Sequence, residues 1–246
     1  MQVAVTGALG RLGAALVSGL SGERHTVRPS DLQAADGDPP TVKADVLCED
    51  DMAALCDGVD AVVHLACASW EEGLSDAENE TRILDTRLKG TCNLMKAAAA
   101  AGVRRVIQVS DLCVYSGYAE DIMVSEDFLP LPDCSAQQQS VYLSELVGRE
   151  FSRLHPGLVL TLRLDRLAEE GAKGASGDDG ARLAMADAVA GIGRALEVDG
   201  FDGIDWGIYN LAADHPGSRY SLLKISSGRF GFRPGHGADG GGEVSG

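Results

Sequence analysis

The sequence predicts an α/β protein built on a doubly wound parallel sheet, and three observations support this prediction. Short apolar runs alternate with helical patterns along most of the chain. The apolar runs are nearly continuous, which is typical of strands buried on both faces. A glycine-rich turn joins the first apolar run directly to the first helical pattern. Together these features indicate a sheet with helices on both of its faces.

The order of the expected elements follows from hydrophobic periodicity and from the residues that end each run. Gly58 and Gly102 each close a helical pattern, and Pro156 stops another. Strands are expected at 1–7, 24–31, 60–66, 104–110, 158–164 and 206–212. Helices are expected at 10–20, 49–58, 77–102, 136–157 and 186–197.

The chain is expected to form one domain over residues 1–235. Segment 168–180 is rich in glycine and charge, and the elements in about 166–235 are too few for more than a small, reduced substrate lobe. Residues 236–246 hold few apolar side chains, so a disordered tail is expected there.

Composition excludes several classes of function. The 21 basic against 37 acidic residues give a formal net charge of −16, which argues against direct binding to nucleic acid or to an anionic membrane surface. No apolar run is long enough to span a membrane or resembles a signal peptide, so a cytoplasmic location is expected. The six cysteines include no C-x-x-C pair, which favours reduced thiols and no metal site.

The glycine-rich turn has the geometry of a dinucleotide-binding motif. Gly7, Gly10 and Gly13 lie in the segment TGALGRLG, between the first strand and the first helix. In such a turn the first glycine permits the bend, the second lets a pyrophosphate approach the backbone, and the third lets the helix pack on the strand. The N–H groups of the turn and helix start, including those of Leu9, Arg11 and Leu12, would face the phosphates.

The second strand ends at Asp31, 24 residues after Gly7. An acidic residue there can accept hydrogen bonds from the adenosine ribose and would repel the 2′-phosphate of NADP. NAD is therefore favoured over NADP. Arg28 lies close enough in sequence to leave NADP as an alternative.

With these motifs, the sequence resembles the extended short-chain dehydrogenase/reductase family of the NAD-dependent epimerase/dehydratase type. The resemblance implies a Rossmann-type fold, a bound NAD, and cofactor contacts from the segments ADV and HLA. The contact residues are Asp45, Val46, Leu65 and Ala66. The segments that match are VAVTGALGRLG, ADV, DAVVHLA, KGTCNLMKAA, VIQVSDLCVYSG and SELVGRE.

The catalytic positions of that family are changed here. The resemblance implies a Ser or Thr, a Tyr and a Lys that assist hydride transfer, and these positions hold Asp111, Val141 and Glu145. Tyr142 stands one residue late, and a one-residue shift of the helix would place Leu146 at the lysine. Whether the chain is an enzyme is therefore open.

Two interpretations of the helix at 136–157 follow. In one it is structural, with Glu145 and Arg149 as a solvated i, i+4 pair. In the other, Asp111 and Glu145 converge as a coupled carboxylate pair that acts as general acid/base, with Tyr142 taking part. His64 is expected to be a strand residue beside the cofactor groove, and Cys113 a core or loop residue.

Two functions remain. One is an NAD-dependent oxidoreductase or epimerase with an atypical active site, acting on a sugar-like or small carbonyl substrate. The other is a non-catalytic NAD(P)-binding protein that acts as a sensor or scaffold. The resemblance also implies a homodimer, formed by helices at about 78–100 and 136–154.

Overall fold

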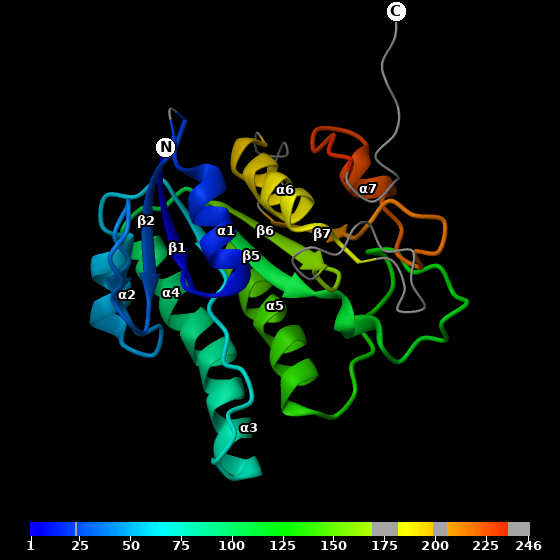
Figure 1. The fold of residues 1–246 in the computed structure, drawn as a ribbon, viewed down its shortest axis with the longest axis horizontal. Helices are drawn as coiled ribbons and strands as arrows, with labels where there is room; N and C mark the ends of the chain where they lie inside the picture. The colour runs from blue at the N-terminus through cyan, green and yellow to red at the C-terminus, as the bar shows by residue number, and fades with distance from the viewer. Residues whose placement is uncertain (23, 169–181, 199–205, 236–246) are drawn as a thin grey trace, which may run out of the picture.

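A computed structural model describes residues 1–22, 24–168, 182–198 and 206–235 of the chain. Seven parallel strands form one sheet in the order β3-β2-β1-β4-β5-β6-β7 (Figure 1). The strand order reverses direction at β1, which has β2 on one side and β4 on the other. Such a switch point leaves a crevice at the carboxyl ends of the two strands, where α/β sheets bind ligands. The predicted doubly wound fold is confirmed.

The strands follow the predicted apolar runs. Each is paired in parallel with its neighbours, so all the carboxyl ends lie along one edge of the sheet. We call this the carboxyl edge. The strands are β1 (Gln2–Thr6), β2 (Thr26–Asp31), β3 (Val42–Lys43), β4 (Ala61–His64), β5 (Arg105–Asp111), β6 (Leu158–Leu164) and β7 (Trp206–Leu211).

Helices cover both faces of the sheet (Figure 1). On one face lie α1 (Arg11–Leu20) and α6 (Met185–Glu197), whose buried residues join Val3, Ile107 and Leu160 in one apolar core. On the other face α2 (Glu49–Cys56), α4 (Gly90–Ala100) and α5 (Ala136–Leu154) enclose a second core. The strands are apolar on both faces because both are covered.

A third cluster lies beyond the carboxyl edge of β5. The 3₁₀ helix η2 (Leu112–Tyr115) supplies Leu112, Val114 and Tyr115, which pack with Val124 and Val141. This cluster holds α5 against the segments that follow β5 and β7, and thereby places side chains from distant parts of the sequence beside the edge.

The helix expected at 77–102 is divided. It consists of α3 (Asp76–Leu84), a π-helical turn η1 (Asp85–Lys89) and α4. Ser75 and Glu78 form a capping box at its start. π-helical turns occur as single-turn insertions, often near functional sites, and no periodicity rule locates them. The two-residue β3 and the short α7 (Leu223–Ser226) were also not predicted.

Within the described ranges, none of the helices has the length and apolar character needed to cross a membrane. The segments 169–181 and 236–246, which hold nearly all of the predicted glycine-rich loop and the whole predicted tail, lie outside the described residues.

Candidate functional site

The glycine turn has the backbone geometry that the motif predicts. Gly7 adopts φ +71°, and a Cβ there would lie 3.0 Å from the Ala66 nitrogen. A Cβ on Gly13 would lie 2.1 Å from the Gly7 carbonyl oxygen, so α1 packs on β1 only with glycine at this position. Gly10 is the N-cap of α1, and no side chain caps the helix. The N–H groups at the start of α1 therefore remain suited to an anion.

A cavity of about 560 Å³ lies beside this turn, at the carboxyl ends of β1, β2 and β4. We call it the cofactor cleft. Eight of the predicted cofactor residues line it, whereas Arg11, Leu12 and Gly13 stand at the helix start behind the turn. The eight are Gly7, Leu9, Gly10, Asp31, Asp45, Val46, Leu65 and Ala66. The remaining lining includes Thr81, Arg82, Asp85 and Thr86 from α3 and η1, which sequence reasoning missed.

Asp31 is held in place by the backbone around the cleft. Its carboxylate accepts hydrogen bonds from the Leu9 N–H at 2.9 Å and the Leu32 N–H at 2.8 Å, one on each oxygen. Each oxygen retains a further lone pair for a ribose hydroxyl. Arg28, by contrast, donates to the carbonyl oxygens of Leu55 and Asp57. Its guanidinium is thus already bound to backbone on the other side of β2.

His64 lies where the sequence predicts, in β4 close to the glycine turn. The residue is 4% exposed, and its ring contacts the Thr6 hydroxyl at 2.8 Å and the Thr91 hydroxyl at 3.0 Å. Burial, together with the charge of Arg87, lowers the pKa of His64 to about 4. The neutral ring therefore links β1, β4 and α4 at neutral pH, as a structural residue behind the cleft.

The expectation that Glu145 and Arg149 form a solvated pair is wrong. Glu145 is 2% exposed and forms a bidentate ion pair with Arg163, with distances of 2.8 and 2.6 Å. Arg149 instead pairs with Glu150 on the surface of α5. The prediction failed because the i, i+4 rule considers one helix alone, whereas β6 supplies a buried arginine directly beneath α5.

The Glu145–Arg163 pair belongs to a buried polar network. The Ser110 hydroxyl donates to Glu145, and Arg163 also donates to the Tyr115 hydroxyl. Tyr115 in turn donates to the Ser125 carbonyl oxygen at 2.9 Å. Burial alone would lower the pKa of Arg163, but the hydrogen bonds and charge of Glu145 outweigh it and raise that pKa. The lysine position is thus occupied by an ion pair that joins α5, β6 and η2.

Asp111 and Glu145, predicted as a converging pair, have separate partners. The Asp111 carboxylate accepts the Cys113 N–H at 2.6 Å, as the N-cap of η2. Tyr142 is half-buried against the third cluster, next to Val141, which is fully buried. Within the described part of the chain, the Tyr142 hydroxyl makes no hydrogen bond. The catalytic roles of Asp111, Tyr142 and Glu145 stay predictions.

Sequence reasoning missed two further side chains near Asp111. Asp165 directly follows β6, and Leu164, the residue before it, pairs with Asp111 across the β5–β6 register. Tyr220 packs on the third cluster from the segment that follows β7. Aspartates at the ends of two adjacent parallel strands were a usable signal for Asp165, because such ends meet at one edge. No sequence pattern pointed to Tyr220.

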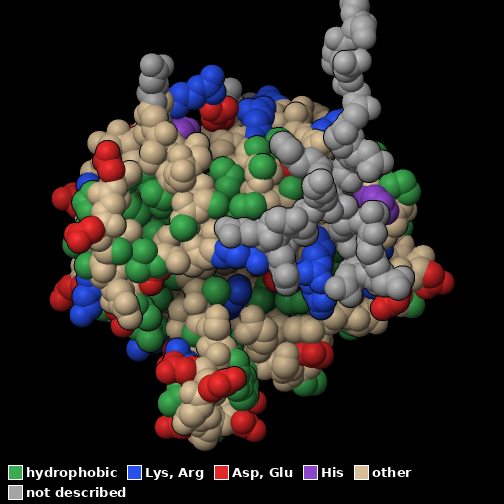
Figure 2. Space-filling model, in the orientation of Figure 1, with side chains coloured by type: hydrophobic (Ala, Val, Ile, Leu, Met, Phe, Trp, Pro, Cys, Tyr) green, Lys and Arg blue, Asp and Glu red, His purple; other side chains and the backbone are tan. Residues whose placement is uncertain are grey.

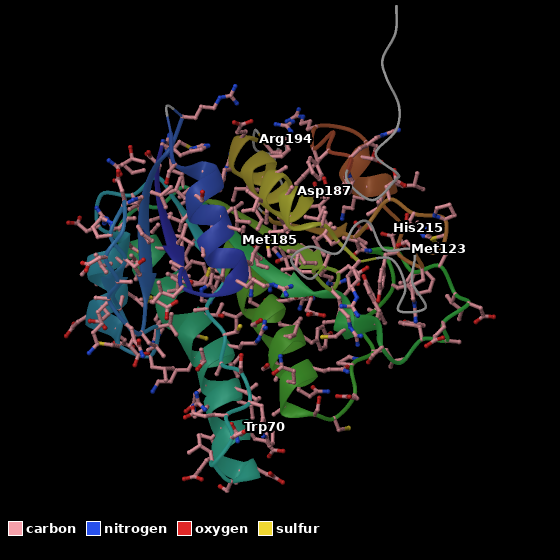
Figure 3. All side chains as sticks on the ribbon, viewed as in Figure 1. Trp70, Met123, Met185, Asp187, Arg194 and His215 are labelled. Carbon is pink, nitrogen blue, oxygen red and sulfur yellow. The ribbon has the colours of Figure 1, made fainter. Side chains whose placement is uncertain are left out.

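A second, more open hollow of about 980 Å³ lies between α1 and α6. Met185 and Arg194 of α6, labelled in Figure 3, are among its lining residues. It lies on a helical face of the sheet, away from the glycine turn and the carboxyl edge. We therefore place the candidate functional site at the cofactor cleft and the adjoining ends of β5 and β6.

A parallel sheet with this switch point, glycine turn and acidic strand end defines a Rossmann-type dinucleotide-binding protein. Comparison with known proteins agrees with that class. The model of the NAD dependent epimerase/dehydratase family matches residues 3–164, and the chain belongs to this family.

Three curated relatives illustrate the similarity. L-arabinose 1-dehydrogenase (NAD(P)(+)) of Haloferax volcanii is 29% identical over 66% of both chains. A 3 beta-hydroxysteroid dehydrogenase/Delta 5-->4-isomerase of Mycobacterium tuberculosis is 32% identical over 54% of this chain and 37% of its own length. Uronate dehydrogenase of Pseudomonas putida is 26% identical over 62% of this chain and 56% of its own. The matches thus span between about a third and two thirds of the relatives.

Solved structures share the fold. Uronate dehydrogenase from Agrobacterium tumefaciens superposes with a TM-score of 0.78 at 20% identity, covering 92% of this chain and 81% of that one. A short-chain dehydrogenase/reductase superfamily protein from the same species, with bound NAD, gives 0.73 at 24% identity, over 87% and 78% of the two chains.

Proposed function

We propose that the protein is an NAD-dependent oxidoreductase that acts on a sugar-like alcohol or a small carbonyl compound. The observation that supports this most strongly is the cofactor cleft, which combines an uncapped helix N-terminus, close-packed glycines and an acidic strand end. The named activities of the curated relatives, an arabinose and a uronate dehydrogenase among them, support a small polyhydroxylated substrate.

The residues of the cleft fit the dinucleotide. The start of α1 and the Gly10 backbone would bind the pyrophosphate, and Asp31 the adenosine ribose. Asp45 and Val46 would flank the adenine, with Leu65 and Ala66 opposite the turn. When bound, the nicotinamide group accepts or donates hydride, and the protein's part is to orient substrate and move the proton.

NAD is preferred over NADP in this proposal because the Asp31 carboxylate would face the ribose and Arg28 is bound to backbone carbonyls. Asp31→Asn keeps the shape and one acceptor oxygen but removes the charge. We expect the ratio of NADP⁺ to NAD⁺ affinity to rise by about tenfold, roughly 1.4 kcal/mol. Calorimetric titration with both dinucleotides measures the ratio. Asp36→Asn, an exposed aspartate nearby, serves as the control and should leave it unchanged.

The activity itself is tested by following NADH formation with NAD⁺ and a panel of alcohols. The panel holds L-arabinose, D-glucuronate and a 3β-hydroxysteroid, which represent the substrate classes named for the relatives. We expect oxidation of a sugar or sugar acid and none of the steroid. NAD binding without turnover of any member would support the second candidate function instead.

That second candidate is a non-catalytic NAD-binding protein. Two observations favour it. The buried Glu145–Arg163 ion pair fills the position of the family's lysine, and Val141 stands at the position of the tyrosine. At the position of the lysine that assists a conventional tyrosine base, this chain holds Glu145. The oxidoreductase hypothesis therefore requires that other residues act as the acid and base in catalysis.

A homodimer through α3, α4 and α5 is also proposed, from the positions these helices occupy in similar proteins. Figure 1 shows α3 projecting beyond the sheet, alongside α5. We expect light scattering after size exclusion to give twice the 25.6 kDa chain mass. A mass of one chain at all accessible concentrations would contradict it.

A further inference from the structure

Three segments far apart in sequence meet at the carboxyl edge beside the cofactor cleft. Asp111 ends β5, and Asp165 follows the residue that pairs with it on β6. Tyr220 lies in the segment after β7, which is hydrogen-bonded to the segment after η2. The Val124 N–H donates to the Arg219 carbonyl oxygen, and the Ser221 N–H donates to the Val124 carbonyl oxygen, both at 2.8 Å. Met123 and His215, labelled in Figure 3, mark where these two segments lie side by side.

The Tyr115 ring and the Arg219 guanidinium both lie against the Tyr220 ring. The Tyr220 ring lies 6.5 Å from that of Tyr115, tilted by 33°. The Arg219 guanidinium lies 5.8 Å from the Tyr220 ring. Tyr115 is itself clamped by Arg163 and Ser125. The buried network beneath α5 therefore supports the phenol that stands at the edge.

The two carboxylate oxygens of Asp165 differ in their hydrogen bonds. Its Oδ1 accepts the Arg166 N–H at 2.7 Å, and its own N–H donates to the Leu211 carbonyl at 3.0 Å. Its Oδ2 makes no hydrogen bond with any described residue. The carboxylate is thus oriented by backbone while keeping an acceptor available.

Burial and the charges around the edge shift the pKa values of Asp165 and Tyr220. Burial, and then the charge of Asp111, raise the pKa of Asp165. Burial, followed by the charges of Asp165 and Asp111, raises the pKa of Tyr220, which therefore stays a proton donor at neutral pH. The other charged and titratable groups facing these residues are Arg166, Arg219 and Cys113, with Arg87 and Glu145 acting on Cys113.

We propose that Asp165 is the general base of this site and Tyr220 its hydrogen-bond donor to the substrate oxygen, with Asp111 tuning Asp165. The inference rests on the proposed oxidoreductase function and supplies the acid and base that positions 141 and 145 lack. Both residues come from outside the helix where the family's tyrosine and lysine are found.

The proposed step balances with the dinucleotide as oxidant. The hydroxyl proton of an alcohol substrate moves to Asp165 Oδ2, and the O–H electron pair becomes the second carbon–oxygen bond. The oxidised nicotinamide dinucleotide, when bound, would accept the hydride from the same carbon. The Tyr220 hydroxyl keeps its proton and donates a hydrogen bond to the substrate oxygen throughout, as its raised pKa requires.

Turnover is the first readout. With the substrate found in the panel, Asp165→Asn should lower kcat by about 10²–10⁴-fold while the Kd for NAD⁺ stays within about twofold. Tyr220→Phe should lower kcat by about 10²–10³-fold. Asp127→Asn, an exposed carboxylate in the segment that follows η2, is the matched control and should keep full activity. Full activity of Asp165→Asn would overturn the proposal and leave the oxidoreductase function standing.

The second readout is independent of turnover. A carboxyl group whose pKa is raised in the folded state destabilises the fold when the pH is above that pKa, because the group is then ionised. Below its pKa in the unfolded chain, about 3.9, the group is protonated in both states and does not change the stability. Asp165→Asn should therefore raise the melting temperature at pH 8, with the gain shrinking toward zero as the pH falls to about 4. Asp127→Asn should show no such trend.

The two readouts separate the possible failures. If no panel member is oxidised, the oxidoreductase function fails, and a pH-dependent gain in Asp165→Asn still supports a raised pKa of Asp165 in the folded protein. A melting difference that is flat in pH would contradict the raised pKa of Asp165, and with it the proposed base, whatever the turnover shows.

Discussion

Replacing Glu145 by alanine is expected to lower the melting temperature more than any other single change in α5. The substitution leaves the Arg163 charge buried without its partner, which costs about 3–5 kcal/mol. For a chain of this size that corresponds to a fall of roughly 6–20 °C. Thermal denaturation followed by circular dichroism measures it.

The matched control is Glu150→Ala, which removes an exposed carboxylate of the same helix that pairs with Arg149 and Arg153. Little or no change is expected there, since exposed pairs are screened by water. The double variant Glu145→Leu, Arg163→Met should recover most of the lost stability, because an apolar pair replaces a buried charge pair without leaving either charge alone. Equal effects of Glu145→Ala and Glu150→Ala would contradict the buried pair.

The same geometry predicts that Glu145→Lys does not restore family-type chemistry. The new ammonium would lie against the Arg163 guanidinium, at a site where the side chains of positions 145 and 163 are each 2% exposed. Two buried like charges repel, so the variant should be at least as unstable as Glu145→Ala. The charge at position 145 cannot be changed alone, because β6 has a complementary charge beneath it.

The second large effect is expected at Gly13. A Cβ there would lie 2.1 Å from the Gly7 carbonyl oxygen and 2.8 Å from the Ala8 Cα, both backbone atoms. Gly13→Ala must therefore push α1 away from β1, which costs about 1–3 kcal/mol or more and displaces the helix start from the cleft. Both the melting temperature and NAD affinity should fall.

Gly10→Ala separates binding from folding. Its Cβ would meet only the Gly7 oxygen, at 3.3 Å, so the fold is expected to tolerate it. The added methyl group occupies the approach of the pyrophosphate, and NAD affinity should fall by at least about tenfold. Gly193→Ala in α6 has its nearest neighbour at 3.6 Å and serves as the control for both glycines. Unchanged NAD affinity in Gly10→Ala would place the pyrophosphate elsewhere.

The fold, the glycine turn and the acidic strand end were predictable because all three depend on local rules. Continuous apolar runs identify strands buried on both faces, and the spacing of Gly7, Gly10 and Gly13 requires a tight strand–turn–helix junction. The position of Asp31 at a strand end then follows. All three features are read from short segments, and the structure confirms their geometry.

The part of the candidate site at the ends of β5 and β6 was not predictable in the same way. The partner of Glu145 is Arg163, which lies 18 positions away on another element, and i, i+4 spacing favoured Arg149 instead. Tyr220 reaches the edge only because its segment is bonded to Val124, nearly a hundred positions earlier. Such contacts depend on how segments without regular structure pack, and no periodicity encodes them.

NAD binding at the cofactor cleft is tested by the melting temperature of the wild-type chain with and without NAD⁺. At a concentration 100 times Kd, binding stabilises the fold by about 2.7 kcal/mol. That should raise the melting temperature by roughly 5–10 °C, with a smaller shift for NADP⁺. If millimolar NAD⁺ or NADH left the melting temperature unchanged, NAD binding at the cofactor cleft would be contradicted.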